Sequence, residues 1–136
     1  MRREMKSRFE THGDLSWCEL LTTDIEGAKR FYKEVLGWGM EQMPMEGEPY
    51  TVIRAGDHRV GGIMRMPEQV PAGTPPHWET YITVNDVDAV ARKAKEQGGR
   101  ILVLPTDIPN VGRFCTFQDP QGEVLSAIMY KEMAKD

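Results

Sequence analysis

Residues 19–28 read Glu19-Leu20-Leu21-Thr22-Thr23-Asp24-Ile25-Glu26-Gly27-Ala28, and residues 81–90 repeat the pattern as Tyr81-Ile82-Thr83-Val84-Asn85-Asp86-Val87-Asp88-Ala89-Val90. Each stretch is an apolar, extended run that leads into the start of a helix. A shift of 62 residues (from 24 to 86) carries Asp24 onto Asp86, and it also carries Gly37 onto Gly99 just past each helix. A repeat of this size in a chain of 136 residues predicts two copies of one supersecondary unit.

Composition narrows the class of protein. A chain of 136 residues with 40% apolar content can bury one core, so we expect one domain over 1–136. The net charge of −4 argues against nucleic acid as a partner, and no run of residues is long and apolar enough for a membrane span. Two cysteines, Cys18 and Cys115, are too few for a disulfide scaffold. We therefore expect a cytoplasmic, reduced protein without a nucleic-acid or membrane partner.

Each copy of the repeat is predicted to run β-α-β-β-β. In the first copy, at about 14–66, the extended run 15–22 precedes a helix capped by Thr23, with Glu26 completing a capping box. Further strands are expected near 38–43, 50–55 and 60–66. The segment 67–76 holds four prolines and is predicted to be a linker. The second copy, at about 77–130, repeats the order, with a helix capped by Asn85 or Asp86.

Alternation along the predicted first strands assigns their two faces. In the second copy, Trp78 and Ile82 are expected to pack under the helix, which leaves His77, Glu79 and Tyr81 on the other side. The same reasoning in the first copy places Trp17 and Glu19 away from the helix. Two related sheets with their free faces turned inward would enclose a cavity, so these side chains are predicted to line a small-molecule site.

The repeat, the segment Asp24-Ile25-Glu26-Gly27-Ala28-Lys29-Arg30-Phe31-Tyr32 and the turn Asp119-Pro120-Gln121-Gly122 together resemble the vicinal oxygen chelate (VOC) superfamily, which includes glyoxalase I, bleomycin-resistance proteins and extradiol dioxygenases. The segments Trp17-Cys18-Glu19-Leu20, Leu36-Gly37-Trp38 and Gly61-Gly62-Ile63-Met64 are similar to its glyoxalase-like branch. The resemblance implies an α+β fold of two βαβββ modules in tandem, forming cupped, half-barrel mixed sheets with the helices on the convex face. Together with the exposed strand edges of such modules, it also implies a homodimer.

In the resembled family, four equivalent strand positions bind a divalent metal. Carried over by position, they fall on Trp17, one residue of Gly61–Met64, Glu79 and Ser126. Only Glu79 is a common ligand, whereas catalytic divalent metals need about three protein ligands. We therefore expect no metal and no other cofactor. A rearranged metal site built from His77, Glu79 and Glu19 is the alternative.

Two kinds of function remain open at this point. One is a binding protein that holds a small apolar or aromatic molecule in the cavity between the repeats, with a lining formed by Trp17, His77, Tyr81, Met64, Ser126 and Arg113. Methionine adapts to apolar ligands, and Arg113 could pair with the Glu79 carboxylate. The other is an enzyme of the lyase, isomerase or oxygenase type, without metal or with a relocated one, in which Glu79 or Glu19 acts as acid/base or ligand.

Overall fold

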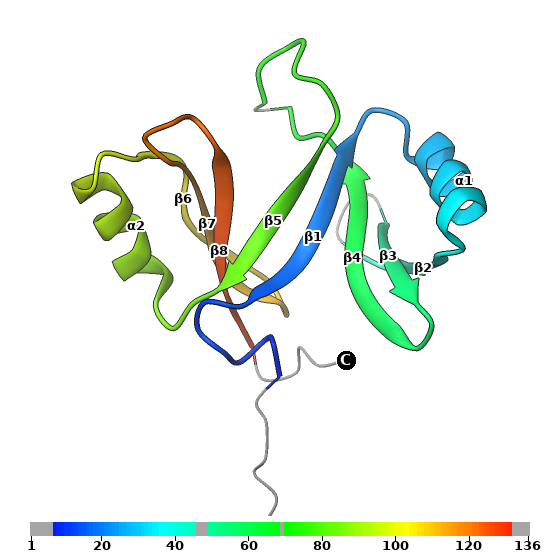
Figure 1. Cartoon of the computed structure of the whole chain (residues 1–136), viewed down its shortest axis with the longest axis horizontal. Coiled ribbons are helices and arrows are strands. Elements are labelled where there is room, and N and C mark those ends of the chain that lie inside the picture. The colour runs from blue at the N-terminus through cyan, green and yellow to red at the C-terminus, as the bar shows by residue number, and fades with distance from the viewer. Residues whose placement is uncertain (1–6, 46–48, 69, 132–136) are drawn as a thin grey trace, which may run out of the picture. The chain divides into compact units, whose positions relative to one another are not determined.

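Two compact units make up the chain in a computed structural model, which describes residues 7–45, 49–68 and 70–131. The N-terminal unit comprises residues 17–79, and the C-terminal unit combines the described residues up to 16 with those from 80 onward. The elements follow the predicted order, β-α-β-β-β twice, which confirms the α+β fold (Figure 1). The described residues leave out both ends of the predicted domain, at 1–6 and 132–136, and position 69 of the predicted linker.

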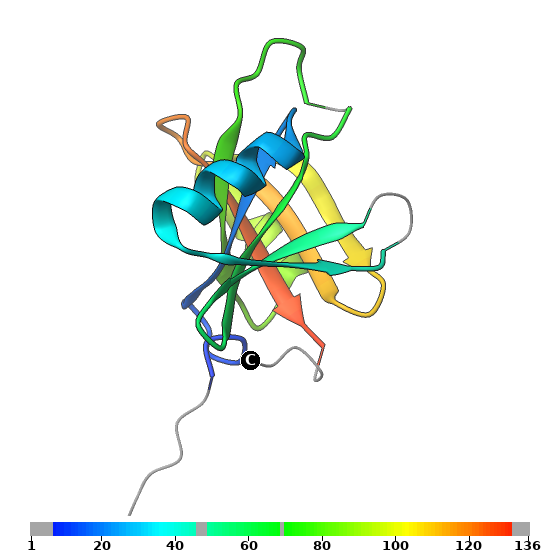
Figure 2. The same ribbon diagram turned by 90° about the vertical axis from the view of Figure 1, so that its right-hand side faces the viewer.

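The sheet of the N-terminal unit is mixed and has the strand order β2-β3-β4-β1, with β1 parallel to β4 and the other pairs antiparallel. Its elements are β1 (Leu15–Thr22, of which 15–16 belong to the C-terminal unit), α1 (Ile25–Leu36), β2 (Gly39–Met43), β3 (Tyr50–Ala55) and β4 (His58–Arg65). Leu20, Ile53 and Ile63 form the buried core on the side of α1, where Ala28 and Tyr32 pack against them. Figure 2 shows α1 running across one side of this unit.

Helix α1 begins one residue later than the sequence suggested. The N-cap is Asp24, whose Oδ1 accepts a hydrogen bond from the Gly27 amide at 2.9 Å. The predicted cap at Thr23 is therefore wrong, because the Thr22 hydroxyl already holds the Asp24 amide at 3.2 Å and fixes the chain direction there. Gly37 ends the helix in the left-handed conformation, with φ of 70°.

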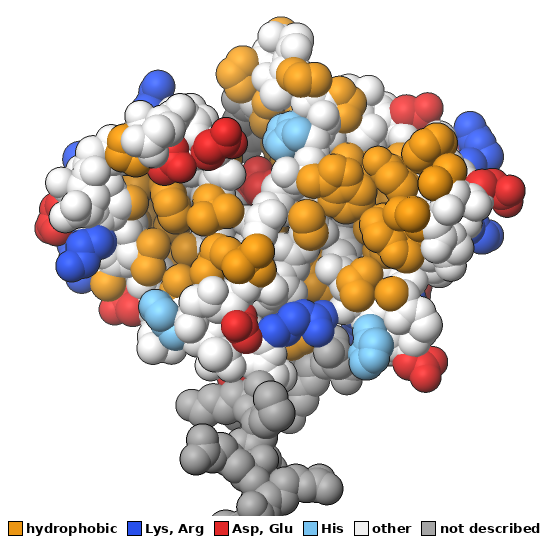
Figure 3. Space-filling view, viewed as in Figure 1, with side chains coloured by type: hydrophobic (Ala, Val, Ile, Leu, Met, Phe, Trp, Pro, Cys, Tyr) orange, Lys and Arg blue, Asp and Glu red, His pale blue; other side chains and the backbone are white. Residues whose placement is uncertain are grey.

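The outer part of α1 carries apolar side chains that stay exposed. More than half of the surface of Phe31, Val35 and Leu36 is accessible, and no residue of α1 is fully buried. Figure 3 shows apolar side chains gathered around this helix. Next to it, the rings of Tyr32, Trp38 and Trp78 contact one another, with centroids 5.5–5.9 Å apart. A surface of this composition is typical of a contact with another protein chain.

The C-terminal unit repeats the arrangement with the strand order β5-β8-β7-β6. Its elements are β5 (His77–Thr83, of which 77–79 belong to the N-terminal unit), α2 (Val87–Glu96), β6 (Arg100–Ile108), β7 (Gly112–Gln118) and β8 (Val124–Tyr130). Asp86 caps α2 by accepting from the Ala89 amide at 3.1 Å, which matches the cap at Asp24. Among the described residues, neither helix is long and apolar enough to cross a membrane.

Candidate functional site

The candidate site lies on the side of the N-terminal sheet that faces away from α1, which we call the far face. Because Leu20 and Ile63 point toward α1, their neighbours in the pleat point the other way. Glu19 and Gly62 are direct partners on β1 and β4, and Val52 is the partner of Gly62 on β3. Glu19 is buried, with 8% of its surface accessible, and Val52 is buried with 3%.

Tyr50 links two predicted site residues on this face. Its hydroxyl donates to Glu19 Oε2 at 2.5 Å, and it accepts from the indole Nε1 of Trp17 at 3.0 Å. Trp17 and Glu19 therefore share one face, as strand alternation predicts. A short hydrogen bond to a carboxylate is among the stronger ones in proteins, so the three side chains hold each other in a defined geometry.

Gly62 makes the link between Tyr50 and Glu19 possible. Tyr50 starts β3, Glu19 lies on β1, and β4 runs between these two strands. The Tyr50 side chain crosses directly over Gly62, because a Cβ atom at position 62 would lie only 1.8 Å from the Tyr50 hydroxyl oxygen. Tyr50 was not among the predicted site residues. The signal that could have found it is the pair Gly61-Gly62 inside a strand, since glycine there often marks the close approach of another group.

Glu79 and His77 lie on the opposite side of β5 from Trp78, whose ring packs against Tyr32 and Trp38 of the N-terminal unit. Glu79 is half-buried. The Nδ1 atom of His77 lies 3.0 Å from the Pro75 carbonyl oxygen, so this ring is engaged at the start of the strand.

In the C-terminal unit, Tyr81 and Ser126 are direct partners on β5 and β8. The Tyr81 ring lies 6.3 Å from that of Phe114, and the Ser126 hydroxyl is 2.7 Å from that of Thr116. Ser126 is fully buried. These two predicted site residues therefore lie together on one face of their sheet. A shared cavity with the residues of the N-terminal unit stays a prediction.

A concave region lies at the start of α1 and has a volume of about 290 Å³; it is lined by Thr23, Asp24, Ile25, Glu26, Gln42, Pro49, Thr51 and Arg65. Its charged groups already have structural tasks. Asp24 caps the helix, and Arg65 donates to the Thr23 carbonyl at 3.3 Å. We therefore take the far face, where Trp17, Tyr50 and Glu19 are joined by hydrogen bonds, as the candidate site.

With this geometry in place, the chain can be compared with known proteins. Residues 14–126 match the family model of the Glyoxalase/Bleomycin resistance protein/Dioxygenase superfamily, which is the VOC superfamily. The chain belongs to this superfamily. The predicted resemblance is thus confirmed.

Relatives within the VOC superfamily include longer proteins. CFP32 of Mycobacterium bovis, named as a glyoxylase, is 44% identical over 117 residues, which cover 85% of this chain and 44% of CFP32. The anthracycline biosynthesis protein DnrV of Streptomyces peucetius is 33% identical over 120 residues, which cover 88% of this chain and 42% of DnrV. The chain spans less than half the length of these relatives. Methylmalonyl-CoA epimerase from Mycobacterium tuberculosis has a similar structure, with a TM-score of 0.61, 15% identity and coverage of 92% and 91% of the two chains.

The metal-binding positions of the VOC superfamily can be tested against the residues present. Trp17 offers an indole that is already bonded to Tyr50, and Ser126 offers a hydroxyl that is bonded to Thr116. In the stretch Gly61–Met64, the two far-face positions are Gly62, which has no side chain, and Met64. Glu79 is thus the one usual ligand among the four positions, and such a donor set does not fit a divalent metal, which needs about three carboxylate, imidazole or thiolate ligands. Among the described residues, no group of three His, Cys, Asp or Glu could hold a metal ion.

The sequence predicts Arg113 as a ligand-binding residue that pairs with the Glu79 carboxylate. In the structure, its guanidinium pairs with two aspartates instead. Its Nε and Nη2 donate to the two carboxylate oxygens of Asp88 on α2, both at 3.0 Å, and its Nη1 donates to Asp107 at 3.1 Å. The guanidinium beside it holds the pKa of the Asp88 carboxyl below its usual value, and the pKa of Arg113 is raised in turn. Arg113 therefore lies on the helix side of its sheet and connects α2 to β6 and β7.

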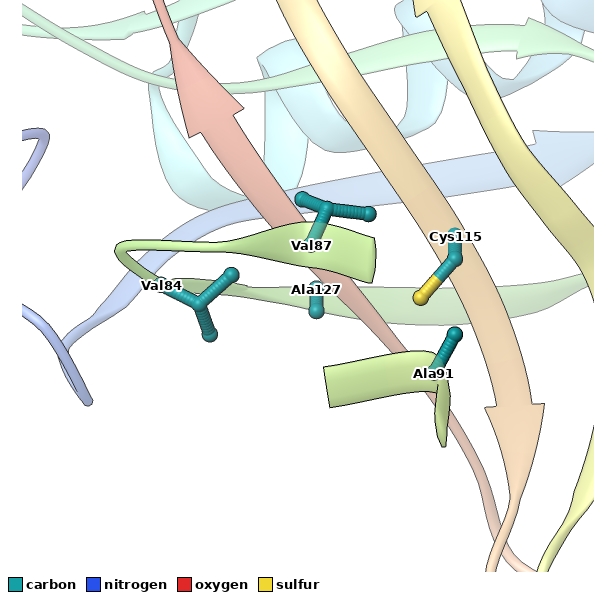
Figure 4. Close-up of a cluster of buried hydrophobic side chains, with 5 residues drawn as sticks. All are labelled: Val84, Val87, Ala91, Cys115 and Ala127. Atoms are coloured by element: carbon teal, nitrogen blue, oxygen red, sulfur yellow. The ribbon is translucent and has the colours of Figure 1, made fainter. Parts of the chain in front are cut away.

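Cys115 also faces α2. It is fully buried beside Val87, Ala91 and Ala127 (Figure 4). Burial raises the pKa of this thiol, which favours the protonated, unreactive form. Sequence alone left the direction of Cys115 open, and the structure places it in the core.

Proposed function

We propose that this VOC protein binds a small, apolar or aromatic molecule on the far face of its N-terminal sheet, without the usual metal of the superfamily. The observation that carries the proposal is the hydrogen-bonded set of Trp17, Tyr50 and Glu19. It combines two aromatic side chains with a buried carboxylate on one surface. Such a combination of apolar lining with few, well-positioned polar groups is typical of small-molecule sites.

The neighbouring side chains support an apolar or aromatic ligand. Met64, which is half-buried, adds apolar surface next to the aromatic rings, and methionine adapts its shape to different ligands. An aromatic ring of Trp17 or Tyr50 can stack on a planar molecule. DnrV, a relative at 33% identity, is named as an anthracycline biosynthesis protein.

Tryptophan fluorescence tests this proposal because the chain has three tryptophans, of which Trp17 alone lies on the far face. A neutral aromatic probe, N-phenylnaphthylamine, should quench tryptophan emission on binding. Trp17→Phe should remove most of this response, whereas the matched control Trp78→Phe, on the side of α1, should keep it. Quenching that survives in Trp17→Phe would place the binding elsewhere and overturn the proposal.

The proposed absence of a metal has its own test. Trp17, Gly62 and Ser126 supply none of the usual ligands at their positions, so purified protein should contain well below one equivalent of zinc, nickel, manganese or iron. Elemental analysis by mass spectrometry measures this content. About one tightly held ion per chain that is lost in Glu79→Ala would contradict the proposal.

A catalytic role is the second candidate, favoured by the 2.5 Å hydrogen bond between Tyr50 and Glu19. A carboxylate and a phenol so close together can exchange a proton with a bound molecule, which is the requirement for acid/base catalysis. Glu79 is the other candidate for this role. Turnover of a compound that is lost in Glu19→Gln or Glu79→Gln, while its binding remains, would establish an enzyme.

The predicted homodimer belongs to the proposal too. The exposed apolar side chains on α1, Phe31, Val35 and Leu36, offer a surface that a second chain would cover. Light scattering at high micromolar concentration should give twice the chain mass of 15.5 kDa, and Phe31→Glu should shift the equilibrium to the monomer. A wild-type monomer under these conditions would refute the expectation. The cytoplasmic location stays a prediction.

A further inference from the structure

The concave region at the start of α1 lies on the opposite side of the N-terminal sheet from the proposed site. Thr51, which lines it, is the direct partner of Ile63 on β4, and Ile63 packs in the core on the side of α1. Direct partners point to the same face of a sheet, so the Thr51 side chain also lies on the α1 side. Every residue that lines the region belongs to the N-terminal unit. The region is therefore a separate feature of this unit.

The Thr51 hydroxyl is buried but has no partner in the protein. Only 2% of the surface of Thr51 is accessible, and within the described ranges 7–45, 49–68 and 70–131 its hydroxyl makes no hydrogen bond. In the same ranges, every fully enclosed side-chain nitrogen or oxygen does have a hydrogen-bond partner. The Thr51 oxygen must therefore reach accessible space, and the concave region that Thr51 lines supplies it. A buried hydroxyl without a protein partner costs free energy, so a partner from outside the chain would account for it.

The first turn of α1 adds unused donors to the same region. The amides of Ile25 and Glu26 stand at the first two positions of the helix, where no carbonyl of the preceding turn can reach them. No partner for these two amides occurs in the part of the chain that the structure describes. Gln42, which is the direct partner of Thr51 on β2, adds an exposed side-chain amide that can donate and accept. The region thus combines a hydroxyl, an amide side chain and backbone N–H groups.

The charged groups of the region oppose one another and already have partners. Asp24 Oδ1 accepts from the amide that it caps, and Glu26 Oε2 lies 3.4 Å from Lys29 Nζ. Arg65 Nη1 donates to the Thr23 carbonyl at 3.3 Å. A ligand of either charge would therefore meet a group of the same sign on the lining. An uncharged ligand avoids this repulsion and needs only the groups that have no partner.

The size of the region limits the ligand further. Its volume of about 290 Å³ lies at the lower end of the range for ligand pockets, which is about 300–1,000 Å³. Pro49 and the half-buried Ile25 supply apolar surface beside the polar groups. Such a lining suits a compact molecule with one ring or a short chain, whose carbon atoms contact the apolar surface while its polar groups form hydrogen bonds.

We propose that the concave region at the start of α1 is a second small-molecule site, and that it binds an uncharged compound with several hydroxyl groups, of the size of a monosaccharide. Each ligand hydroxyl can donate and accept, so it matches the Thr51 hydroxyl and the Gln42 amide, and it can accept from the Ile25 amide. The inference does not depend on the proposed function, because the two sites lie on opposite faces of the sheet.

Nuclear magnetic resonance of the full chain, labelled with ¹⁵N, locates weak binding of this kind. Glucose is the uncharged probe, while glucosamine and glucose 6-phosphate are a cation and an anion with the same ring. Glucose at millimolar concentrations should shift the amide signals of Ile25, Gln42 and Thr51 in a saturable manner. The amide signals of α2, in the C-terminal unit, should stay in place. Each charged probe should bind several-fold more weakly than glucose.

The decisive variant is Thr51→Val, which removes the hydroxyl and keeps nearly the same shape. It should weaken glucose binding about two- to tenfold, the range for one neutral hydrogen bond. Because the hydroxyl has no partner in the protein, the urea midpoint of Thr51→Val should stay equal or rise. Thr22→Val is the contrast, since the buried Thr22 hydroxyl accepts from the Asp24 amide at 3.2 Å, and it should lower the midpoint. Thr51→Ser keeps the hydroxyl and should keep glucose binding.

Two glutamine variants complete the design. Gln42→Ala should weaken glucose binding about two- to tenfold as well, because it removes one neutral hydrogen-bonding group from the lining. Gln97→Ala, at the exposed end of α2, is the matched control and should leave glucose binding unchanged. Circular dichroism verifies that each variant remains folded.

Several outcomes would overturn the inference. One is the absence of saturable shifts with glucose, and another is glucose binding that is unchanged in Thr51→Val. Tighter binding of either charged probe would contradict the uncharged ligand class. A loss of stability in Thr51→Val as large as that in Thr22→Val would show that the hydroxyl has a partner within the protein. None of these results affects the proposed function, which is measured by quenching of Trp17 on the far face.

Discussion

Replacement of Tyr50 by phenylalanine removes a single oxygen atom and two hydrogen bonds from the far face. The first is the bond to the Glu19 carboxylate at 2.5 Å, and the second is the bond from the Trp17 indole at 3.0 Å. A hydrogen bond to a charged group contributes about 1.5–3 kcal/mol to stability, and a neutral one contributes about 0.5–1.5 kcal/mol. Because Glu19 is buried, the carboxylate loses a partner in a place with little water.

The expected cost of Tyr50→Phe is therefore about 3 kcal/mol in the free energy of unfolding, with both bonds counted. Urea denaturation followed by far-ultraviolet circular dichroism measures this value, since that signal does not depend on Trp17. The urea dependence of the unfolding free energy should stay unchanged, because the variant exposes no additional surface. Tyr32→Phe is the matched control, as the Tyr32 ring contacts Trp38 and Trp78 through its face and edge. It should change the unfolding free energy by less than about 0.5 kcal/mol.

A double-mutant cycle with Glu19→Gln isolates the bond between the two residues. If Tyr50 and Glu19 stabilise the protein through their mutual contact, the coupling energy should exceed about 1 kcal/mol. A cost below about 1 kcal/mol for Tyr50→Phe, together with a coupling energy near zero, would refute the description of these residues as one unit.

Three further predictions concern other parts of the chain. Because Arg113 lowers the pKa of Asp88 from its usual 3.8, the contribution of this carboxylate to stability is present above that pH and is lost as the pH falls below it. The stability difference between wild type and Asp88→Asn should therefore shrink between about pH 5 and pH 3, as measured by urea denaturation across this range. Iodoacetamide should label the half-buried Cys18 before Cys115, which should react only after unfolding, as detected by peptide mass spectrometry. Asp24→Ala should cost about 1 kcal/mol of unfolding free energy, since α1 loses its cap.

The repeat was readable from the sequence because it is encoded in local chemistry. Asp24 and Asp86 both cap a helix, and the residues around them alternate between two faces of a strand. The same alternation correctly placed Leu20 toward α1 and brought Trp17 and Glu19 to one side. Such features depend on residues that are close in the chain, so no knowledge of the fold is needed to find them.

The parts that the sequence did not reveal depend on strand register. Tyr50 reaches Glu19 across an intervening strand, and no local pattern specifies which residue of β3 lies beside which residue of β1. Likewise, the choice of Asp88 over Glu79 as the partner of Arg113 follows from the face of β7 on which Arg113 lies. A shift of the β7 pairing register by one residue would have placed the Arg113 side chain on the opposite face of the sheet.

The crossing of Tyr50 over Gly62 also constrains how this protein can change by mutation. With Tyr50 in place, any side chain at position 62 would collide with the phenol, which comes within 1.8 Å of where its Cβ would be. A side chain at position 62 therefore requires that the Tyr50 ring moves away or is replaced, and either change breaks its hydrogen bonds to Trp17 and Glu19. The two positions should therefore covary among relatives, with tyrosine at position 50 found together with glycine at position 62.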